Sequence, residues 1–85
     1  MYLDTDCTYT ETVTPHTYVF IGRCKITREW TRVVVRAEEL FRLRQGEKIQ
    51  YALLHNTPAE REFLMTGVSE RGWEQLFPQN GQREN

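Results

Sequence analysis

Residues 7–36 alternate polar and apolar side chains with a period of two, the period of a β-strand lying on a core. The stretch 7–14, CTYTETVT, sets four threonines against bulkier side chains and is followed by Pro15, a pattern typical of a half-exposed edge strand. The stretches 17–27 and 30–36 are more apolar, and two residues separate them. We therefore expect an antiparallel hairpin, although the intervening Arg-Glu is not a favoured turn dipeptide.

A two-residue turn at Arg28 and Glu29 fixes the pairing of this hairpin. The expected pairs are Ile26 with Thr31, Cys24 with Val33, and Gly22 with Val35. One face of the hairpin is then apolar and is expected to face the core: Phe20, Cys24, Ile26, Val33 and Val35. A loop one residue longer would exchange the partners of the two faces, so this assignment depends on the register.

The opposite face of the hairpin combines positive charge with one large aromatic ring. Its expected members are Arg23, Lys25, Trp30, Arg32 and Arg36. Cations beside an indole are frequent in binding surfaces, so this basic face is the first candidate for binding a partner. The competing interpretation is an ordinary solvated face, on which the Lys and Arg stems cover Trp30 through cation–π contact.

From residue 37 onward the apolar period changes to about 3.6, which indicates helices. Residues 37–46 predict a short amphipathic helix that begins with two glutamates and ends near Gly46. Residues 47–56 predict a second helix that stops at Asn56, so the two stretches form a helix pair or one helix kinked at Gly46. The side chains expected on the two apolar stripes are Leu40, Phe41, Leu43, Ile49, Ala52 and Leu53, with Tyr51 and Leu54 beside them.

The stretch 57–78 carries the clearest start and stop signals of a helix. Thr57 is a predicted N-cap, Pro58 takes the first helical position, and Glu60 completes a capping box. Gly67 is the predicted left-handed end of this helix, and Ser69 caps the next one. The first of these helices is expected to turn Phe63 and Leu64 inward, with Met65 as a gap-filler.

The aromatic end of the last helix allows two interpretations. Trp73, Leu76 and Phe77 close a thin core as a lid, or Trp73 and Phe77 remain partly exposed as an alternative partner-binding ridge. Residues 79–85 are polar and are expected to form a frayed tail. The pattern as a whole predicts one α+β domain over residues 1–78, with a small N-terminal antiparallel sheet of two to three strands packed by three to four short C-terminal helices.

Composition narrows the class of protein further. A chain of 85 residues with 39% hydrophobic residues and a net charge of -1 is typical of one small globular domain. Its apolar runs are too short to cross a bilayer and its first residues lack the regions of a signal peptide, so we expect a cytoplasmic protein. In that compartment Cys7 and Cys24 are expected to remain free thiols.

Residues that carry chemistry are present, but they form no recognisable catalytic or cofactor motif. His16 and His55 lie apart from any nucleophile motif, and together with Cys7 and Cys24 they lack the paired spacing of a zinc site. Capping and helix-dipole effects or solvated positions account for the remaining carboxylates, Glu38, Glu39, Glu60, Glu62, Glu70 and Glu74. We therefore expect a protein that is not an enzyme and needs no metal or cofactor.

The C-terminal half contains a series of short motifs in a fixed order. A helix that ends near a Gly is followed by "IQYA", by a capped "REFLMTG" and by "WEQLF", all within residues 41–78. In this series the chain resembles small, mostly uncharacterised proteins of tailed phages and prophages. The resemblance implies a phage-encoded protein that works in the host bacterial cytoplasm, and it brings no catalytic residues with it.

These observations lead to two expectations of different classes. The first is a non-enzymatic accessory protein that binds a host or viral protein, with inhibitors of host defence systems such as anti-CRISPRs as one subclass. An exposed edge strand is also compatible with a homodimer. The alternative is a weak nucleic-acid-binding module that uses the basic face, although its sequence pI of 6.1 is low for that class.

Overall fold

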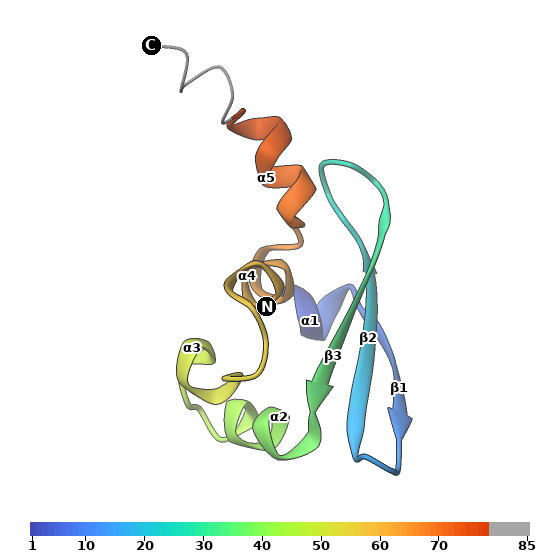
Figure 1. Cartoon of the computed structure of the whole chain (residues 1–85), viewed down its shortest axis with the longest axis vertical. Helices are drawn as coiled ribbons and strands as arrows, with labels where there is room; N and C mark the ends of the chain where they lie inside the picture. The colour runs from blue at the N-terminus through green and yellow to red at the C-terminus, as the bar shows by residue number, and fades with distance from the viewer. Residues whose placement is uncertain (79–85) are drawn as a thin grey trace.

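The computed structural model describes residues 1–78 and consists of one antiparallel sheet with short helices on one side (Figure 1). The strands come from the first half of the chain, and four of the five described helices follow them in sequence. The fold is therefore α+β, as the sequence predicts. Among the described residues no helix covers the other face of the sheet (Figure 1). The expected tail at 79–85 lies outside the described residues.

The sheet contains three strands, β1 (Thr8–Thr12), β2 (Thr17–Arg23) and β3 (Trp30–Arg36), in the order β1-β2-β3. Both pairings are antiparallel, so β2 is central while β1 and β3 are edges. All five residues of β1 are exposed, which agrees with the predicted edge strand. β2 and β3 each bury alternate residues, as expected for strands with one face on a core.

The two-residue turn predicted for the β2–β3 hairpin is wrong. β2 ends at Arg23, and residues 24–29 form a loop closed by a hydrogen bond from Cys24 N–H to the Glu29 carbonyl, 2.9 Å. The register is consequently shifted by four residues from the predicted one, with Phe20 opposite Val33. Because four is an even number, the shift leaves the two faces of the strands unchanged.

Contacts with the helices explain why the chain leaves the sheet at Cys24. The Cys24 sulfur accepts N–H groups from Thr27 at 3.4 Å and from Ser69 at 3.3 Å. The next residue, Lys25, donates its N–H to the Gly67 carbonyl at 2.9 Å. The connection between the last two helices therefore holds the loop, and the loop takes Lys25 and Ile26 out of the predicted strand.

A short N-terminal helix, α1 (Tyr2–Thr5), was not predicted from the sequence. It buries Tyr2 and Leu3, and the Tyr2 ring meets Phe63 edge-on with ring centroids 5.4 Å apart. The Tyr2 hydroxyl donates to the carbonyl of Arg23, at the end of β2. A single helical turn has no periodicity to detect, so its burial depends on contacts with residues far along the chain.

The middle helices are shorter than the pattern predicts. α2 (Ala37–Arg44) is followed by a one-turn helix, α3 (Ile49–Ala52). Leu40, Ile49, Ala52 and Leu53 are buried as predicted, and Leu43 packs partly against the core. The predicted inward positions of Phe41, Tyr51 and Leu54 are wrong, because one or two helical turns place only a narrow stripe on a thin core.

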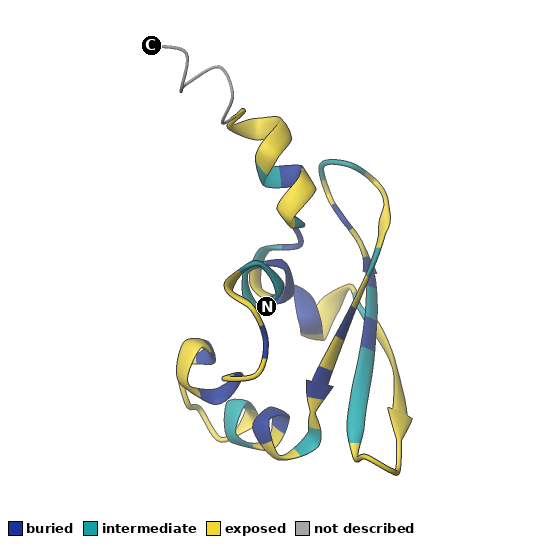
Figure 2. Ribbon diagram, viewed as in Figure 1, coloured by how far each residue is buried: buried dark blue, intermediate teal, exposed yellow. Residues whose placement is uncertain are grey.

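The last two helices have the predicted ends. In α4 (Pro58–Thr66) the Thr57 and Glu60 side chains form a complete capping box, and Gly67 ends the helix with φ 83°. In α5 (Glu70–Leu76) the Ser69 side chain accepts the Gly72 N–H. Phe63 and Leu64 of α4 are buried, whereas Met65 is exposed and fills no gap (Figure 2).

Within residues 1–78 two polar side chains are buried, Glu39 of α2 and Asn56 just before α4. Glu39, 1% exposed, accepts hydrogen bonds from His55, through the ring Nδ1 and the backbone N–H. This corrects the expectation of a solvated or dipole-compensating Glu39. Asn56 donates its amide N–H groups to the Val34 carbonyl at 2.9 Å and to the Glu60 carboxylate at 3.0 Å. Asn56 thereby joins β3 to the capping box of α4.

Gly67 makes a sharp test of this packing, because Gly46 offers a matched control. Both have positive φ, but a Cβ on Gly67 would lie 2.6 Å from the Tyr2 ring, whereas a Cβ on Gly46 meets nothing within 4 Å. Gly46→Ala is expected to lower the free energy of unfolding by about 1 kcal/mol through backbone strain alone. Gly67→Ala is expected to lower it by about 3 kcal/mol, because overpacking adds to the strain.

Urea unfolding followed by circular dichroism measures both values. Equal losses in the two variants would contradict the close packing of Tyr2 on the α4–α5 connection.

Candidate interaction surface

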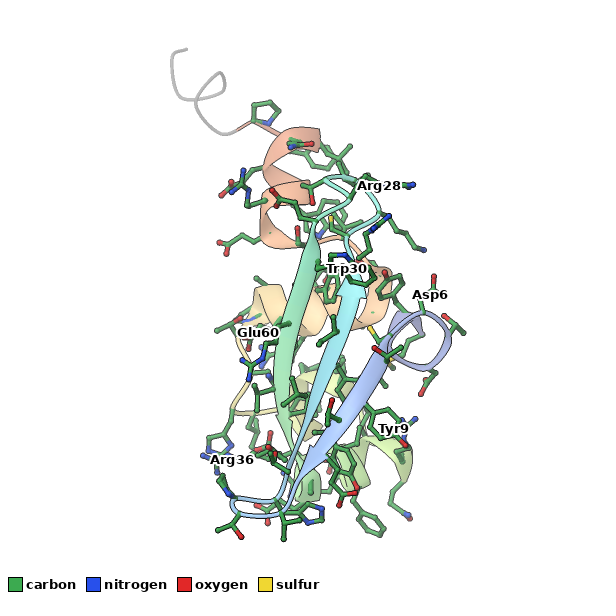
Figure 3. All side chains as sticks on the ribbon, turned by 90° about the vertical axis from the view of Figure 1, so that its right-hand side faces the viewer. Asp6, Tyr9, Arg28, Trp30, Arg36 and Glu60 are labelled. Carbon is green, nitrogen blue, oxygen red and sulfur yellow. The ribbon has the colours of Figure 1, made fainter. Side chains whose placement is uncertain are left out.

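The face of the sheet turned away from the helices, here called the open face, contains most of the predicted basic residues. Paired residues of antiparallel strands share a face, so the register assigns its members. They are Thr8, Thr10, Thr12, Thr17, Val19, Ile21, Arg23, Trp30, Arg32, Val34 and Arg36. Figure 3 looks onto this face, with Trp30 and Arg36 at opposite ends of β3. The set holds three arginines and no carboxylate.

An aromatic and apolar strip runs along the open face between these charges. The Trp30 side chain is 66% exposed, and the Arg23 guanidinium lies over its ring at 4.8 Å from the centroid. This distance confirms the predicted cation–π contact for Arg23. Val34 is also exposed, and Val19 and Ile21 of the central strand are half-buried. The open face therefore offers apolar area that no part of the described chain covers.

The five predicted face residues do not form one patch. Arg23, Trp30 and Arg32 lie together, since Arg23 pairs with Trp30 and Arg32 follows two positions along β3. Arg36 is six residues from Trp30, which is about 20 Å along a strand. Lys25 lies in the hairpin loop with its ammonium 5.3 Å from the centroid of the Tyr2 ring. The compact part of the surface is therefore Arg23, Trp30 and Arg32.

The alternative ridge on α5 is partly exposed, and it does not form the predicted lid. Phe77 and Leu76 are exposed, while the half-buried Trp73 stacks on Phe77 with ring centroids 5.9 Å apart. Glu70 and Glu74 line the same hollow as the two rings. The tip of α5 is thus an aromatic surface with acidic neighbours, opposite in charge to the open face.

A groove beside β3 adds a feature that the sequence did not reveal. It has a volume of about 550 Å³ and lies between β3 and the first turns of α4 and α5. Val33 and Phe63 contribute its apolar lining, and Trp30 and Arg32 connect it to the open face. Figure 3 shows Glu60 beyond the free edge of β3, on the groove side. The sequence predicted Thr57 and Ser69 as helix caps. It contains no local signal for which strand edge these caps lie beside.

The histidines form two pairs with carboxylates. His16 lies 2.6 Å from Glu11 on the surface, and His55 pairs with the buried Glu39. Among the described residues neither histidine hydrogen-bonds to a hydroxyl or thiol, and no group of three metal-ligating side chains occurs. The two pairs therefore have a structural interpretation, in which each histidine ring is held by a hydrogen bond with a carboxylate.

The two cysteines are free thiols, as predicted, but their surroundings differ. Burial raises the pKa of Cys7 to about 11, with the Asp6 carboxylate adding to the effect. Burial also acts to raise the pKa of Cys24, but the hydrogen bonds from Ser69 and Thr27 outweigh it and lower the pKa to about 6. Cys24 is 0% exposed, so these hydrogen bonds hold the loop and do not present a reactive thiol to solvent.

Comparisons of the chain with protein-family models, with curated proteins and with solved structures found no match. The resemblance to tailed-phage proteins therefore stays a prediction. Within the described residues, every helix is too short or too polar to cross a membrane.

The thiol environments predict two separate titrations. In Cys7→Ser, the thiolate absorbance of Cys24 near 240 nm is expected to rise with a midpoint near pH 6, because two N–H donors favour the anion. In Cys24→Ser, the Cys7 signal is expected near pH 11. The low pKa of Cys24 stabilises the fold fully above its unfolded pKa of about 9, and this stabilisation is lost as the pH falls through about 6.

Urea unfolding of Cys7→Ser between pH 6 and 9 measures how the stability of the fold depends on the ionisation of Cys24. Its free energy of unfolding is expected to rise over this interval relative to the variant that lacks both thiols. A midpoint above pH 8 for Cys24 would contradict the assigned hydrogen bonds.

Proposed function

We propose that this chain is a small non-enzymatic accessory protein, of the kind encoded by tailed phages, that binds a host or viral protein through the open face of its sheet. The observation that carries the proposal is the exposed group of Arg23, Trp30 and Arg32, beside uncovered apolar side chains and with no carboxylate on the same face. Tryptophan and arginine are the residues that most often dominate protein interfaces. A host defence component is the partner class we expect, and inhibition is the corresponding role.

The composition of the open face favours a protein partner over nucleic acid. Single-stranded nucleic acid binds by stacking bases on several aromatic rings, whereas this face has one indole, with Arg23 over its ring. Aliphatic side chains, Val19, Ile21 and Val34, occupy its middle. Such a surface complements a partner that presents acidic residues around an apolar patch.

Self-association by stacking two open faces is less favourable than binding a different protein. Two copies would bring Arg23, Arg32 and Arg36 of each chain against the same cations of the other. No carboxylate on that face offsets the repulsion. A homodimer would therefore need a different contact, such as the α5 tip or the edge of β1.

Charge reversal on the open face tests the proposal. The double variant Arg23→Glu with Arg32→Glu is expected to weaken partner binding by about tenfold or more, because it inverts the charge of the interface centre. Lys48→Glu is the matched control for the single variant Arg32→Glu, which changes the net charge by the same amount, since Lys48 is an exposed cation at the start of α3, away from the open face. The measurement is a tagged pull-down from nuclease-treated bacterial lysate, followed by affinity measurement with the captured protein.

Three results would contradict the proposal. Capture that nuclease abolishes would assign the open face to nucleic acid. Unchanged capture by the double variant, with loss in Trp73→Ala or Phe77→Ala, would move the interface to the α5 tip. Equally weakened partner binding in Lys48→Glu would show that the loss of affinity comes from the change in net charge and not from the open face.

A further inference from the structure

The outer edge of β3 has unpaired backbone groups at defined positions. Ala37 donates its N–H to the His16 carbonyl and Cys24 donates to the Glu29 carbonyl, so odd-numbered residues of β3 point their backbone groups toward β2. Even-numbered residues then point their N–H and C=O groups away from the sheet. Val34 agrees with this alternation, because its carbonyl accepts a hydrogen bond from Asn56, outside the sheet.

The unpaired stretch of this edge is short and well defined. Asn56 occupies the carbonyl of Val34 and closes one end, and the hairpin loop closes the other end at Glu29. Between them, the outward backbone groups of Trp30 and Arg32 have no hydrogen-bond partner within residues 1–78. The free stretch from Trp30 to Val33 is four residues, or about 13 Å, long.

The groove described above runs along this same stretch. Glu29, Trp30, Thr31, Arg32 and Val33 all contribute to its lining. On its far side lie the first turns of α4 and α5, which leave a space of about 550 Å³ beside the strand. The free hydrogen-bonding groups of β3 therefore face an open channel with an apolar part at Val33 and Phe63.

We propose that the groove beside β3 binds an extended peptide segment of a partner protein, which adds to the sheet as a fourth strand of about four to five residues. The segment pairs its backbone with the outward groups of Trp30 and Arg32. The proposal rests on the proposed function, since it specifies how the protein partner is held. It adds the chemical class of the ligand, which the open face alone does not define.

The two sides of the added strand meet different surfaces, and this sets the sequence preference. Successive side chains of a strand point to opposite faces, so every second side chain lies on the open face beside Trp30 and Arg32. Arg23 and Arg32 lie on this part of the open face, which has no carboxylate, so acidic residues are favoured at those positions. The alternate side chains point into the groove, whose lining includes Val33, Ala59 and Phe63 as well as the carboxylates of Glu29, Glu60 and Glu70, so apolar residues are favoured there over acidic ones. The expected ligand therefore alternates acidic and apolar residues.

A second copy of this chain fits the groove poorly. The helices α4 and α5 flank the edge of β3, so an approaching sheet would bring its own helices or loops against them. The free edge of about 13 Å is also short for a stable dimer, which needs about 800 Å² of buried surface on each partner. A single extended segment needs only the width of one strand, about 4.8 Å.

The first test uses a synthetic peptide and isotope-labelled protein. Acetyl-Glu-Val-Glu-Val-Glu-Val-amide is titrated into the ¹⁵N-labelled full chain and followed by two-dimensional NMR. The expected result is saturable shifts of the Trp30 and Arg32 amide signals, with amide exchange of Arg32 slowed by about threefold or more. A peptide with Lys in place of Glu, and one with the same composition in two blocks, are expected to bind about tenfold more weakly.

A proline substitution separates strand addition from side-chain contact. Arg32→Pro removes an outward N–H from an edge strand, which leaves the ladder to β2 intact. Its affinity for the peptide is expected to be about tenfold lower than that of Arg32→Ala, which keeps the N–H and loses the same side chain. Glu11→Pro removes the corresponding outward group on β1 and is expected to bind like the wild type, which excludes addition at the other edge.

The outcomes distinguish this inference from the proposed function. Shifts at open-face side chains without protection of the Arg32 amide would overturn strand addition and leave binding through the open face in place. Equal binding of the Lys and Glu peptides would overturn the assigned charge preference. Loss of binding in Glu11→Pro, but not in Arg32→Pro, would place the added strand on β1 and overturn the inference. Saturable protection of Arg32 by the alternating acidic peptide alone supports it.

Discussion

One-sided packing of a three-stranded sheet is the constraint on which the rest of this structure depends. The helices of the described chain have four to nine residues, too few to be stable in water without a core. They are held by a small set of fully buried side chains from both layers, headed by Phe20, Phe63, Leu53 and Leu64. Within residues 1–78 this one layer leaves the second face of the sheet uncovered.

Polar contacts at three junctions connect segments that pack around the small apolar core. Asn56 joins β3 to α4, the Cys24 sulfur joins the hairpin loop to α5, and Tyr2 joins α1 to the end of β2. Each contact links segments more than 20 residues apart in sequence. A buried hydrogen bond contributes only about 1 kcal/mol, but losing one partner leaves a buried polar group unsatisfied. These contacts therefore specify which segments meet more than they add to overall stability.

The sequence predicted the features that depend on neighbouring residues. It did not predict the features that depend on contacts between segments far apart in the chain. The α+β class, the capping box at Thr57 and the left-handed Gly67 follow from neighbouring residues, and all are confirmed. The faces of β2 and β3 were also predictable, because an even register shift preserves alternation. The length of the hairpin loop could not be predicted, because it depends on the contacts that Ser69 and Gly67 make with the loop. For the same reason the buried Glu39 and the groove beside β3 could not be predicted.

The uncovered sheet face and the free edge of β3 have one physical origin. A complete second layer would have hidden Trp30 and Arg32, and a fourth strand of the chain's own would have filled the groove. The two edges of the sheet, β1 and β3, also differ in their surroundings. β1 is exposed along its five residues, whereas the first turns of α4 and α5 flank the edge of β3. In the proposed mode of binding, the edge of β3 accepts a strand from another protein because free backbone groups and a groove occur together there.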